Sequence, residues 1–230
     1  MIEIIGLTKT FGGSPAVDDV TVTFPASSVT ALLGLNGAGK TTLLRGIAGL
    51  DRPDGGTVTV CGQQPCGDPR LVGVHLGPGA LNPRHTVWRH LCWVAALAGI
   101  DTARVTEALV ETGLSGGRAE RIGSLSLGAR QRLAIAGALL GAPRALLFDE
   151  PLNGLDVPGI IWFRGLLRRL ADRGCTVVVA THMLGEVVLS ADRITVLDRG
   201  RLRVAGALDD AVPADAAAQQ WLESTLMGCA

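Results

Sequence analysis

The segment Gly34-Leu-Asn-Gly-Ala-Gly-Lys-Thr41 lies between a short apolar run, Ser28–Leu33, and a helical pattern that begins at Thr41 and ends near Gly49. The spacing G-x-x-x-x-G-K-[ST], after a strand and before a helix, is typical of a loop that binds phosphate groups. In such a loop the glycines let backbone N–H groups turn toward the phosphates, and the helix N-terminus adds a partial positive charge. The residues expected to contact a nucleotide are Gly34, Leu35, Asn36, Gly37, Ala38, Gly39, Lys40, Thr41 and Thr42.

Lysine is rare in this chain, since it occurs only at Lys9 and Lys40 while arginine is frequent. The ammonium group of Lys40 is compact enough to reach the β- and γ-phosphates close to the backbone, where a planar guanidinium does not fit. The hydroxyl of Thr41 is an oxygen ligand of the kind that Mg²⁺ accepts. We therefore expect Lys40 to act in catalysis and Thr41 to bind a magnesium ion.

Two acidic residues, Asp149 and Glu150, directly follow the buried-strand pattern of Ala145–Phe148. The carboxyl ends of parallel strands meet at one edge of a sheet, so both side chains are expected to face the phosphate loop. Asp149 is then the second magnesium ligand, and Glu150 is placed to polarise an attacking water molecule. Two acids after an apolar run are equally typical of a solvated strand end, but the upstream phosphate loop favours the catalytic interpretation.

Three further segments follow in order: Ser126-Leu-Gly-Ala-Arg-Gln-Arg132, Leu147–Asp156 and Ala180-Thr-His182. With the phosphate loop, they resemble the ATP-binding subunits of ATP-binding cassette (ABC) transporters, from Glu3 to about Gly206. The resemblance implies an α/β fold: a RecA-like P-loop NTPase core with an N-terminal antiparallel β-subdomain and an inserted α-helical subdomain.

The resemblance also implies roles for individual residues. In the family, the signature segment, here Leu125–Ala129, contacts the γ-phosphate of ATP held by the opposite subunit, through the positions of Ser126 and Gly128. His182 corresponds to the switch histidine that contacts the γ-phosphate and orders the attacking water. Glu150, His182 and Lys40 are thus the expected catalytic residues.

Two N-terminal residues are expected at the base and sugar of the nucleotide. Phe11 falls where the family stacks an aromatic ring on adenine, and stacking requires only a flat π face. Val17 is expected beside the ribose. From its residue type alone, Phe11 is better explained as a core residue than as a stacking platform. Trp88 and Trp93 are expected to pack within a helix pair, with a groove for a partner helix as the alternative.

A second segment, Leu114-Ser-Gly-Gly117, spells the family's signature more faithfully than Leu125–Ala129 does. The family places its signature at the start of the helix that leads into the Asp-Glu strand, and only Leu125–Ala129 precedes such a helix. We therefore expect Ser126, and not Ser115, to contact ATP.

The chain departs from the family pattern in the segment Val72–Gly77, where Gly77 occupies the position of a usual glutamine. In the family this glutamine touches Mg²⁺ and senses the membrane partner. Leu127 and Ala129 also replace the usual Gly and Gln of the signature. Since the expected chemical groups are all present, we still expect a working ATPase.

Strand and helix signals alternate after residue 28, which favours an α/β core. We expect one domain over residues 1–230, with a nucleotide-binding core at 1–74 and 131–212, a helical lobe at 75–130 and a tail helix at 213–230. The other expected strands are Ile2–Leu7, Asp18–Phe24, Thr57–Cys61, Thr176–Ala180 and a hairpin of Arg193–Asp198 with Leu202–Ala205. One buried face of the first lobe helix is expected to carry Trp88, Cys92, Ala95, Ala96 and Gly99.

The composition excludes several classes of protein. Lys plus Arg (21) balance Asp plus Glu (21), so no net basic field favours nucleic acid as a partner. The uncharged, mostly apolar stretch Leu91–Ile100 is about half of the roughly 20 residues that a membrane-spanning helix requires. The five cysteines lack metal-type spacing and are expected to be free thiols.

We therefore expect a cytoplasmic ATP hydrolase that uses ATP and Mg²⁺, in which two copies enclose two ATP molecules. It would act at the inner face of the cell membrane, on a separate transmembrane permease. The Leu-Ser-Leu-Gly signature, the Thr-His switch and the short C-terminal hairpin resemble bacterial export ATPases for drugs, peptides or lipids. The alternatives are an importer ATPase, a soluble ABC-type resistance or regulatory protein, and another P-loop enzyme, although a GTPase would need an Asn-Lys-x-Asp motif that is absent.

Overall fold

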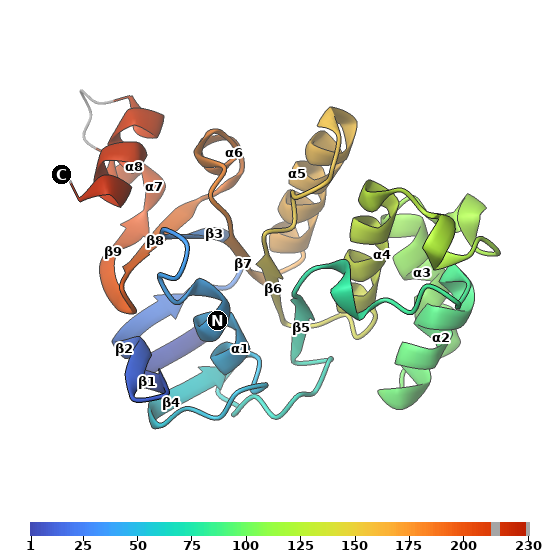
Figure 1. The fold of residues 1–230 in the computed structure, drawn as a ribbon, viewed down its shortest axis with the longest axis horizontal. Coiled ribbons are helices and arrows are strands. Elements are labelled where there is room, and N and C mark those ends of the chain that lie inside the picture. The colour runs from blue at the N-terminus through green and yellow to red at the C-terminus, as the bar shows by residue number, and fades with distance from the viewer. Residues whose placement is uncertain (213–216, 229–230) are drawn as a thin grey trace.

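The computed structural model describes residues 1–212 and 217–228, which form two β-sheets surrounded by helices (Figure 1). The strands are β1 (Ile2–Phe11), β2 (Ser14–Phe24), β3 (Ser28–Leu33), β4 (Gly55–Val60), β5 (Val72–His75), β6 (Ala145–Asp149), β7 (Thr176–Ala180), β8 (Arg193–Asp198) and β9 (Arg201–Ala207). The α-helices are α1 (Lys40–Ile47), α2 (Val87–Leu97), α3 (Thr102–Glu111), α4 (Leu127–Leu139), α5 (Val157–Asp172), α6 (Leu184–Ser190), α7 (Leu208–Ala211) and α8 (Ala218–Met227). Short 3-10 helices cover Pro78–Ala80, Ser115–Gly117 and Ile122–Ser124.

The two sheets have the two architectures that the sequence predicts. The larger sheet has the strand order β5-β6-β7-β3-β8-β9, with every neighbouring pair parallel except the terminal hairpin β8–β9. The smaller sheet has the order β2-β1-β4 and is antiparallel. The prediction of an α/β core with an N-terminal antiparallel sheet is therefore confirmed, and the hairpin after β8 is present.

The central strands β3, β6 and β7 of the larger sheet are buried on both faces, as their nearly continuous apolar sequences predict. On one face, Leu32, Leu147 and Val178 pack in one cluster with α1 and the smaller sheet. On the other face, Phe148 and Val177 pack against α5. Packing on both faces holds the carboxyl ends of β3, β6 and β7 in one place beside the start of α1.

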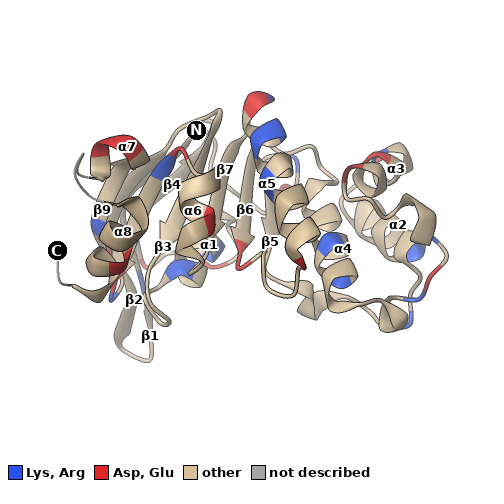
Figure 2. Ribbon diagram, turned by 90° about the horizontal axis from the view of Figure 1, so that it is seen from above, with Lys and Arg blue, Asp and Glu red and all other residues tan. Residues whose placement is uncertain are grey.

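Helix α4 joins the helical lobe to this core (Figure 1). Ile135 and Leu139 pack with α5 and the sheet, while Leu133 and Leu140 pack with α2 and α3. Seen from above in Figure 2, α2 and α3 lie at the end of the molecule farthest from β9. The predicted border between residues 130 and 131 falls inside α4, so the lobe and the core share this helix.

The predicted buried face of α2 was wrong by about one residue. The fully buried residues are Val87, His90, Leu91 and Ala95. Trp88 and Cys92 lie half-buried at the edge of this face, and the Arg118 guanidinium covers the Trp88 ring at 3.9 Å from its centroid. Two neighbouring stripes of α2 are apolar, and helical periodicity alone does not distinguish which of them faces the core.

The C-terminal part of the chain packs beside β8 and β9 (Figure 1). Leu222 of α8 lies in a cluster with Leu33 and Ile194 of the larger sheet and Val187 of α6. The predicted tail helix is present from Ala218, while residues 213–216 and 229–230 of that prediction lie outside the described residues. Among the helices that the structure describes, none combines the length and the apolar character that a bilayer crossing requires.

We predict that Phe163→Ala lowers the free energy of unfolding by about 3–5 kcal/mol, because it empties a filled core position. The Phe163 ring on α5 is buried and meets the Phe148 ring edge-on at 5.2 Å between centroids. Guanidinium denaturation measures the loss, with Ile161→Ala as control, since Ile161 lies on the same helix and is 59% exposed. The control should change stability by no more than about 0.5 kcal/mol. Equal effects of the two changes would contradict this assignment of the core.

Candidate functional site

The loop between β3 and α1 holds the side chain of Lys40 against its own backbone. The Lys40 ammonium donates to the carbonyl oxygens of Gly34 at 2.7 Å and Leu35 at 3.3 Å. Lys40 is also the first residue of α1, and it is buried. The loop thus places one cation at a helix N-terminus, where backbone N–H groups lack partners within the helix.

Only glycine fits at the last position of this loop. Gly39 has φ 101°, a left-handed conformation, and a Cβ atom there would lie 2.2 Å from the carbonyl oxygen of Ala16. The carbonyl belongs to β2 of the smaller sheet. This close approach joins the antiparallel sheet to the phosphate loop.

The two expected metal ligands lie together. The Thr41 hydroxyl donates to Asp149 Oδ2 at 2.6 Å, which joins the first turn of α1 to the carboxyl end of β6. One hydroxyl and one carboxylate provide the hard oxygen ligands that Mg²⁺ prefers. The described residues include no group of three or more His, Cys, Asp and Glu side chains suited to a metal ion, so further ligands would have to come from phosphate oxygens and water.

Glu150 begins a tight turn after β6. Its backbone has φ 47°, an unusual left-handed conformation for a residue with a side chain. The Glu150 N–H donates to the carbonyl of Ala180 at 2.9 Å, and its own carbonyl accepts from Asn153 at 3.3 Å. Such a conformation persists only where the surroundings hold it, and these bonds fix the direction of the carboxylate.

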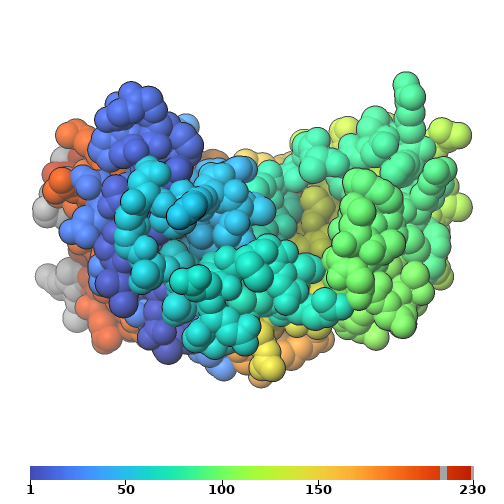
Figure 3. All heavy atoms as spheres, turned by 90° about the horizontal axis from the view of Figure 1, so that it is seen from below, coloured from blue at the N-terminus to red at the C-terminus, as the bar shows by residue number. Residues whose placement is uncertain are grey.

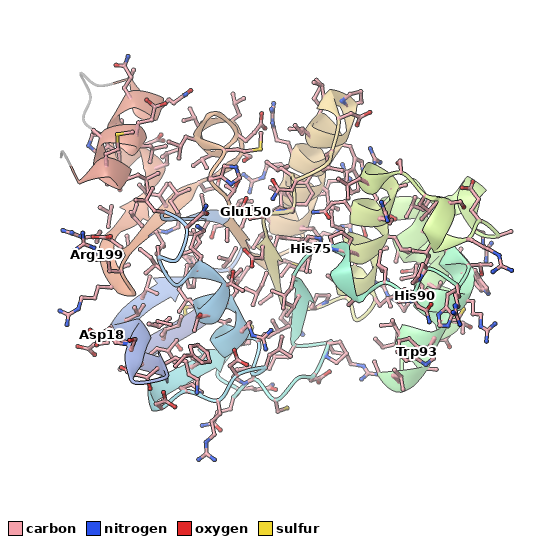
Figure 4. The ribbon with its side chains drawn as sticks, in the orientation of Figure 1. Asp18, His75, His90, Trp93, Glu150 and Arg199 are labelled. Carbon is pink, nitrogen blue, oxygen red and sulfur yellow. The ribbon has the colours of Figure 1, made fainter. Side chains whose placement is uncertain are left out.

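His182 lies beside Glu150, the other expected catalytic residue at this edge of the sheet. Its Nδ1 atom is 2.9 Å from Glu150 Oε2, and the His182 side chain is 62% exposed while that of Glu150 is 25% exposed. Figure 4 shows Glu150 among the central strands. The ring is thus accessible from the solvent side, and its contact limits the rotation of the carboxylate.

Gln131 is a functional candidate that the sequence reasoning missed. Its buried amide on α4 donates from Nε2 to the carbonyls of Glu150 at 3.3 Å and Pro151 at 2.9 Å. Gln131 follows the signature segment by two residues, and this position was read only as part of a helix. A buried polar residue in an apolar helix pattern is the signal that could have found it.

A cleft of about 630 Å³ collects most of these groups. It is lined by Ala16, residues 36–42, Leu76, Gly77, Pro78, Leu127, Gln131, Asp149, Glu150, Asn153 and Gly154. Gly34 and Leu35 contribute through the carbonyls that hold Lys40. The polar floor and the open mouth suit a polyanion that remains partly exposed.

Val17 does not line this cleft, and its place beside the ribose stays a prediction. The Val17 side chain is fully buried in the cluster between the two sheets. Strand alternation places it on the opposite side of β2 from Ala16, which lines the cleft instead. Phe11 is 53% exposed at the end of β1, and the Lys9 ammonium lies 5.5 Å from the centroid of its ring. Phe11 is therefore not a core residue.

Ser126 is exposed and caps the N-terminus of α4, because its Oγ accepts from the N–H of Ala129 at 3.1 Å. Neither Ser126 nor Gly128 lines the cleft of its own chain. Ser115 instead begins the short 3-10 helix Ser115–Gly117, after α3. Only the segment at Ser126 opens the helix that precedes β6, as the choice between the two signature-like segments assumes.

Comparison with known proteins identifies the family of this chain. The family model described as "ABC transporter" matches residues 17–153. The sulfate/thiosulfate import ATP-binding protein CysA of Mycobacterium tuberculosis is 38% identical over 242 residues, which cover 99% of this chain and 68% of CysA. This chain belongs to the ABC transporter family. It is an ATP-binding, ATP-hydrolysing subunit of that family, and its ABC fold has the expected P-loop core.

Other ABC relatives are named for functions that differ from that of CysA. The daunorubicin/doxorubicin resistance ATP-binding protein DrrA of Streptomyces peucetius is 37% identical over 213 residues, 89% of this chain and 64% of DrrA. A solved ATP-binding subunit of an ABC transporter superposes with a TM-score of 0.88 at 26% identity, covering 99% of both chains. A dimeric bacterial ABC transporter cassette has a TM-score of 0.82 at 25% identity, over 90% of this chain and 98% of the cassette.

We predict that Lys40→Ala and Lys40→Arg each weaken ATP binding at least about 100-fold, because both remove a compact cation from the loop. Isothermal titration calorimetry with ATP measures the affinity. Arg45→Ala is the matched control on the same helix, where Arg45 pairs with Asp51 away from the cleft. An unchanged affinity in Lys40→Ala would contradict the assignment of the loop.

Proposed function

We propose that this chain powers the export of a drug, peptide or lipid through a separate membrane subunit, by hydrolysing ATP between two copies of itself. The observation that carries the proposal is the convergence of Lys40, Thr41, Asp149 and Glu150 on one cleft. These four residues lie on two elements, α1 and the end of β6, that the sheet holds together. They provide a cation, two metal ligands and a base for phosphoryl transfer.

In this mechanism the triphosphate lies along residues 36–42, with backbone N–H groups and Lys40 around the β- and γ-phosphates. Thr41 and Asp149 hold Mg²⁺, which supplies neutralisation of phosphate charge. Glu150 accepts a hydrogen bond from the attacking water and orients it toward the γ-phosphate. His182 contacts the Glu150 carboxylate and, in this mechanism, also contacts the γ-phosphate.

A second copy completes each site. Ser126 and Gly128 lie at an exposed helix N-terminus that does not line the cleft of its own chain. Such a terminus attracts an anion, and a facing copy can present it to the γ-phosphate. The dimeric bacterial ABC cassette, at 25% identity, supports this assembly. Phe11 at the exposed end of β1 stacks on the adenine ring in this arrangement.

A groove of about 400 Å³ beside β5 is the proposed place for the membrane subunit. It separates the core from the helical lobe, and Figure 3 shows the surface hollowed between the blue-to-teal core segments and green α2. Its lining residues include Leu50, Gly77, Leu81, His90, Val94 and Ala134. Trp88 and Trp93 do not line it, although Trp93 is exposed next to it on α2. Binding there would hold the chain at the cytoplasmic face of the membrane.

The direction of transport rests on the signature Leu-Ser-Leu-Gly, the Thr-His switch and the similarity to DrrA, a resistance protein. Import is the second candidate, because CysA, an import protein, has 38% identity over 99% of this chain. Co-purification of the tagged chain from native membranes, followed by mass spectrometry, identifies the membrane subunit. ATP-driven uptake into inside-out vesicles that contain this pair supports export, whereas uptake into right-side-out vesicles loaded with ATP supports import.

We predict that Glu150→Gln binds ATP normally but hydrolyses it at least about 100-fold more slowly, because the amide cannot accept the water proton. The variant should accumulate as an ATP-bound dimer in size-exclusion chromatography. Glu223→Gln, a change on the remote helix α8, serves as the control and should remain at the parental rate. Parental hydrolysis by Glu150→Gln would exclude Glu150 as the base.

We predict that Ser126→Trp abolishes ATP turnover while Ser115→Trp changes it by less than about twofold, since only the first position faces ATP across the dimer. Both serines are exposed, so neither change should unfold the chain. Steady-state phosphate release measures turnover. The opposite ranking of the two variants would mean that the signature lies at residues 114–117.

A further inference from the structure

The wall between the nucleotide cleft and the groove beside β5 includes Leu76 and Gly77, which line both. Gln131 lines the cleft, and His75, the last residue of β5, lines the groove. The two residues lie on packed elements, since α4 contacts β5, and the Gln131 side chain acts to raise the pKa of the His75 ring. His75 also pairs in register with Phe148, the residue before Asp149.

The wall contains polar atoms whose bonds are incomplete. Both ring nitrogens of His75 and Oε1 of Gln131 are buried and have no hydrogen-bond partner within the part of the chain that the structure describes. Buried polar groups are nearly always paired, so two unpaired groups on packed elements point to a bond between them. The Gln131 Nε2 group already donates to the carbonyls of Glu150 and Pro151, which leaves only Oε1 for His75.

The protonation of the ring agrees with this pairing. Burial lowers the pKa of His75 to about 4, although the His75 backbone, the Gln131 side chain and the Asp149 backbone act in the opposite direction. The ring is therefore neutral at neutral pH, with one N–H donor and one acceptor nitrogen. A neutral ring can donate to an amide oxygen, and Oε1 of Gln131 can only accept.

We propose that His75 is a positioning residue for ATP hydrolysis: its ring N–H donates to Gln131 Oε1 and orients the amide that holds the Glu150 turn. The chain of contacts runs from the groove through His75 and Gln131 to the backbone of Glu150. The left-handed conformation of Glu150 needs such support, and Gln131 binds the carbonyls on both sides of the Glu150–Pro151 bond. Gly77 has no side chain that could provide this link. This inference rests on the proposed role of Glu150 as the base.

The test compares three substitutions that differ in the donor they retain. His75→Leu removes every donor, His75→Asn places an amide N–H near the position of Nδ1, and His75→Gln places one near that of Nε2. We expect His75→Leu to lower kcat about tenfold with KM for ATP within about twofold of the parent, because the base is displaced while the phosphate loop is untouched. One of the two amide variants should recover at least about half of kcat, and its identity assigns the donor nitrogen.

The control is His85→Leu. His85 lies just before α2, where it contacts Asn82 and the rings of His90 and Trp93, and it lines neither the cleft nor the groove. It should retain parental kcat. Melting temperatures are measured for all variants, so that a loss of folded protein is separated from a loss of turnover. Parental kcat in His75→Leu, equal losses in all three His75 variants, or an equal loss in His85→Leu would overturn the proposal.

A double-mutant cycle tests the contact itself. Gln131→Leu should lower kcat, and adding His75→Leu to it should cause little further loss, since both act through one hydrogen bond. Additive losses would overturn the proposal. The same assays on Glu150→Gln distinguish the role of Glu150 as the base from the role of His75 as a positioning residue. A strong loss of kcat in Glu150→Gln together with parental kcat in His75→Leu would reject the positioning role of His75 and leave the assignment of Glu150 intact.

Discussion

The hydrogen bond between the Thr41 hydroxyl and Asp149 joins two parts of the chain that lie 108 residues apart. It forms because β3 and β6 run parallel in one sheet, with only β7 between them, so both end at the same edge. The phosphate loop follows one strand and the acidic pair follows the other. Any disturbance of this parallel order would separate the cation from the carboxylates, and a cleft suited to a triphosphate would no longer exist.

Much of this site could be predicted from the sequence, because local patterns determine it. The loop geometry at Gly39 needs glycine, and the apolar runs at β3, β6 and β7 match strands buried on both faces. The buried face of α2 was misassigned by about one residue, because distant packing partners and not the local pattern decide which face is buried. Gln131 was missed for a related reason: its role depends on carbonyls 19 and 20 residues away in sequence, which only the tertiary fold brings to its amide.

Helix α4 connects what would otherwise be two separate hydrophobic cores. Leu133 belongs to the helical-lobe cluster, and Ile135 belongs to the cluster beneath α5. The same helix begins at Ser126 and carries Gln131 against the Glu150 turn. A rotation of the lobe therefore cannot leave the catalytic turn unaffected, because one rigid helix contacts both.

Lys40 is already removed from water before any ligand arrives, since its ammonium is buried and held by two loop carbonyls. The desolvation free energy of the ammonium is therefore spent during folding and not during ligand binding. When a phosphate anion binds, its negative charge replaces the neutral carbonyl dipoles around the Lys40 ammonium. The ammonium itself needs little reorganisation. The loop therefore holds the Lys40 ammonium in place whichever phosphate chain binds. Discrimination between two and three phosphates falls to the groups beyond the loop.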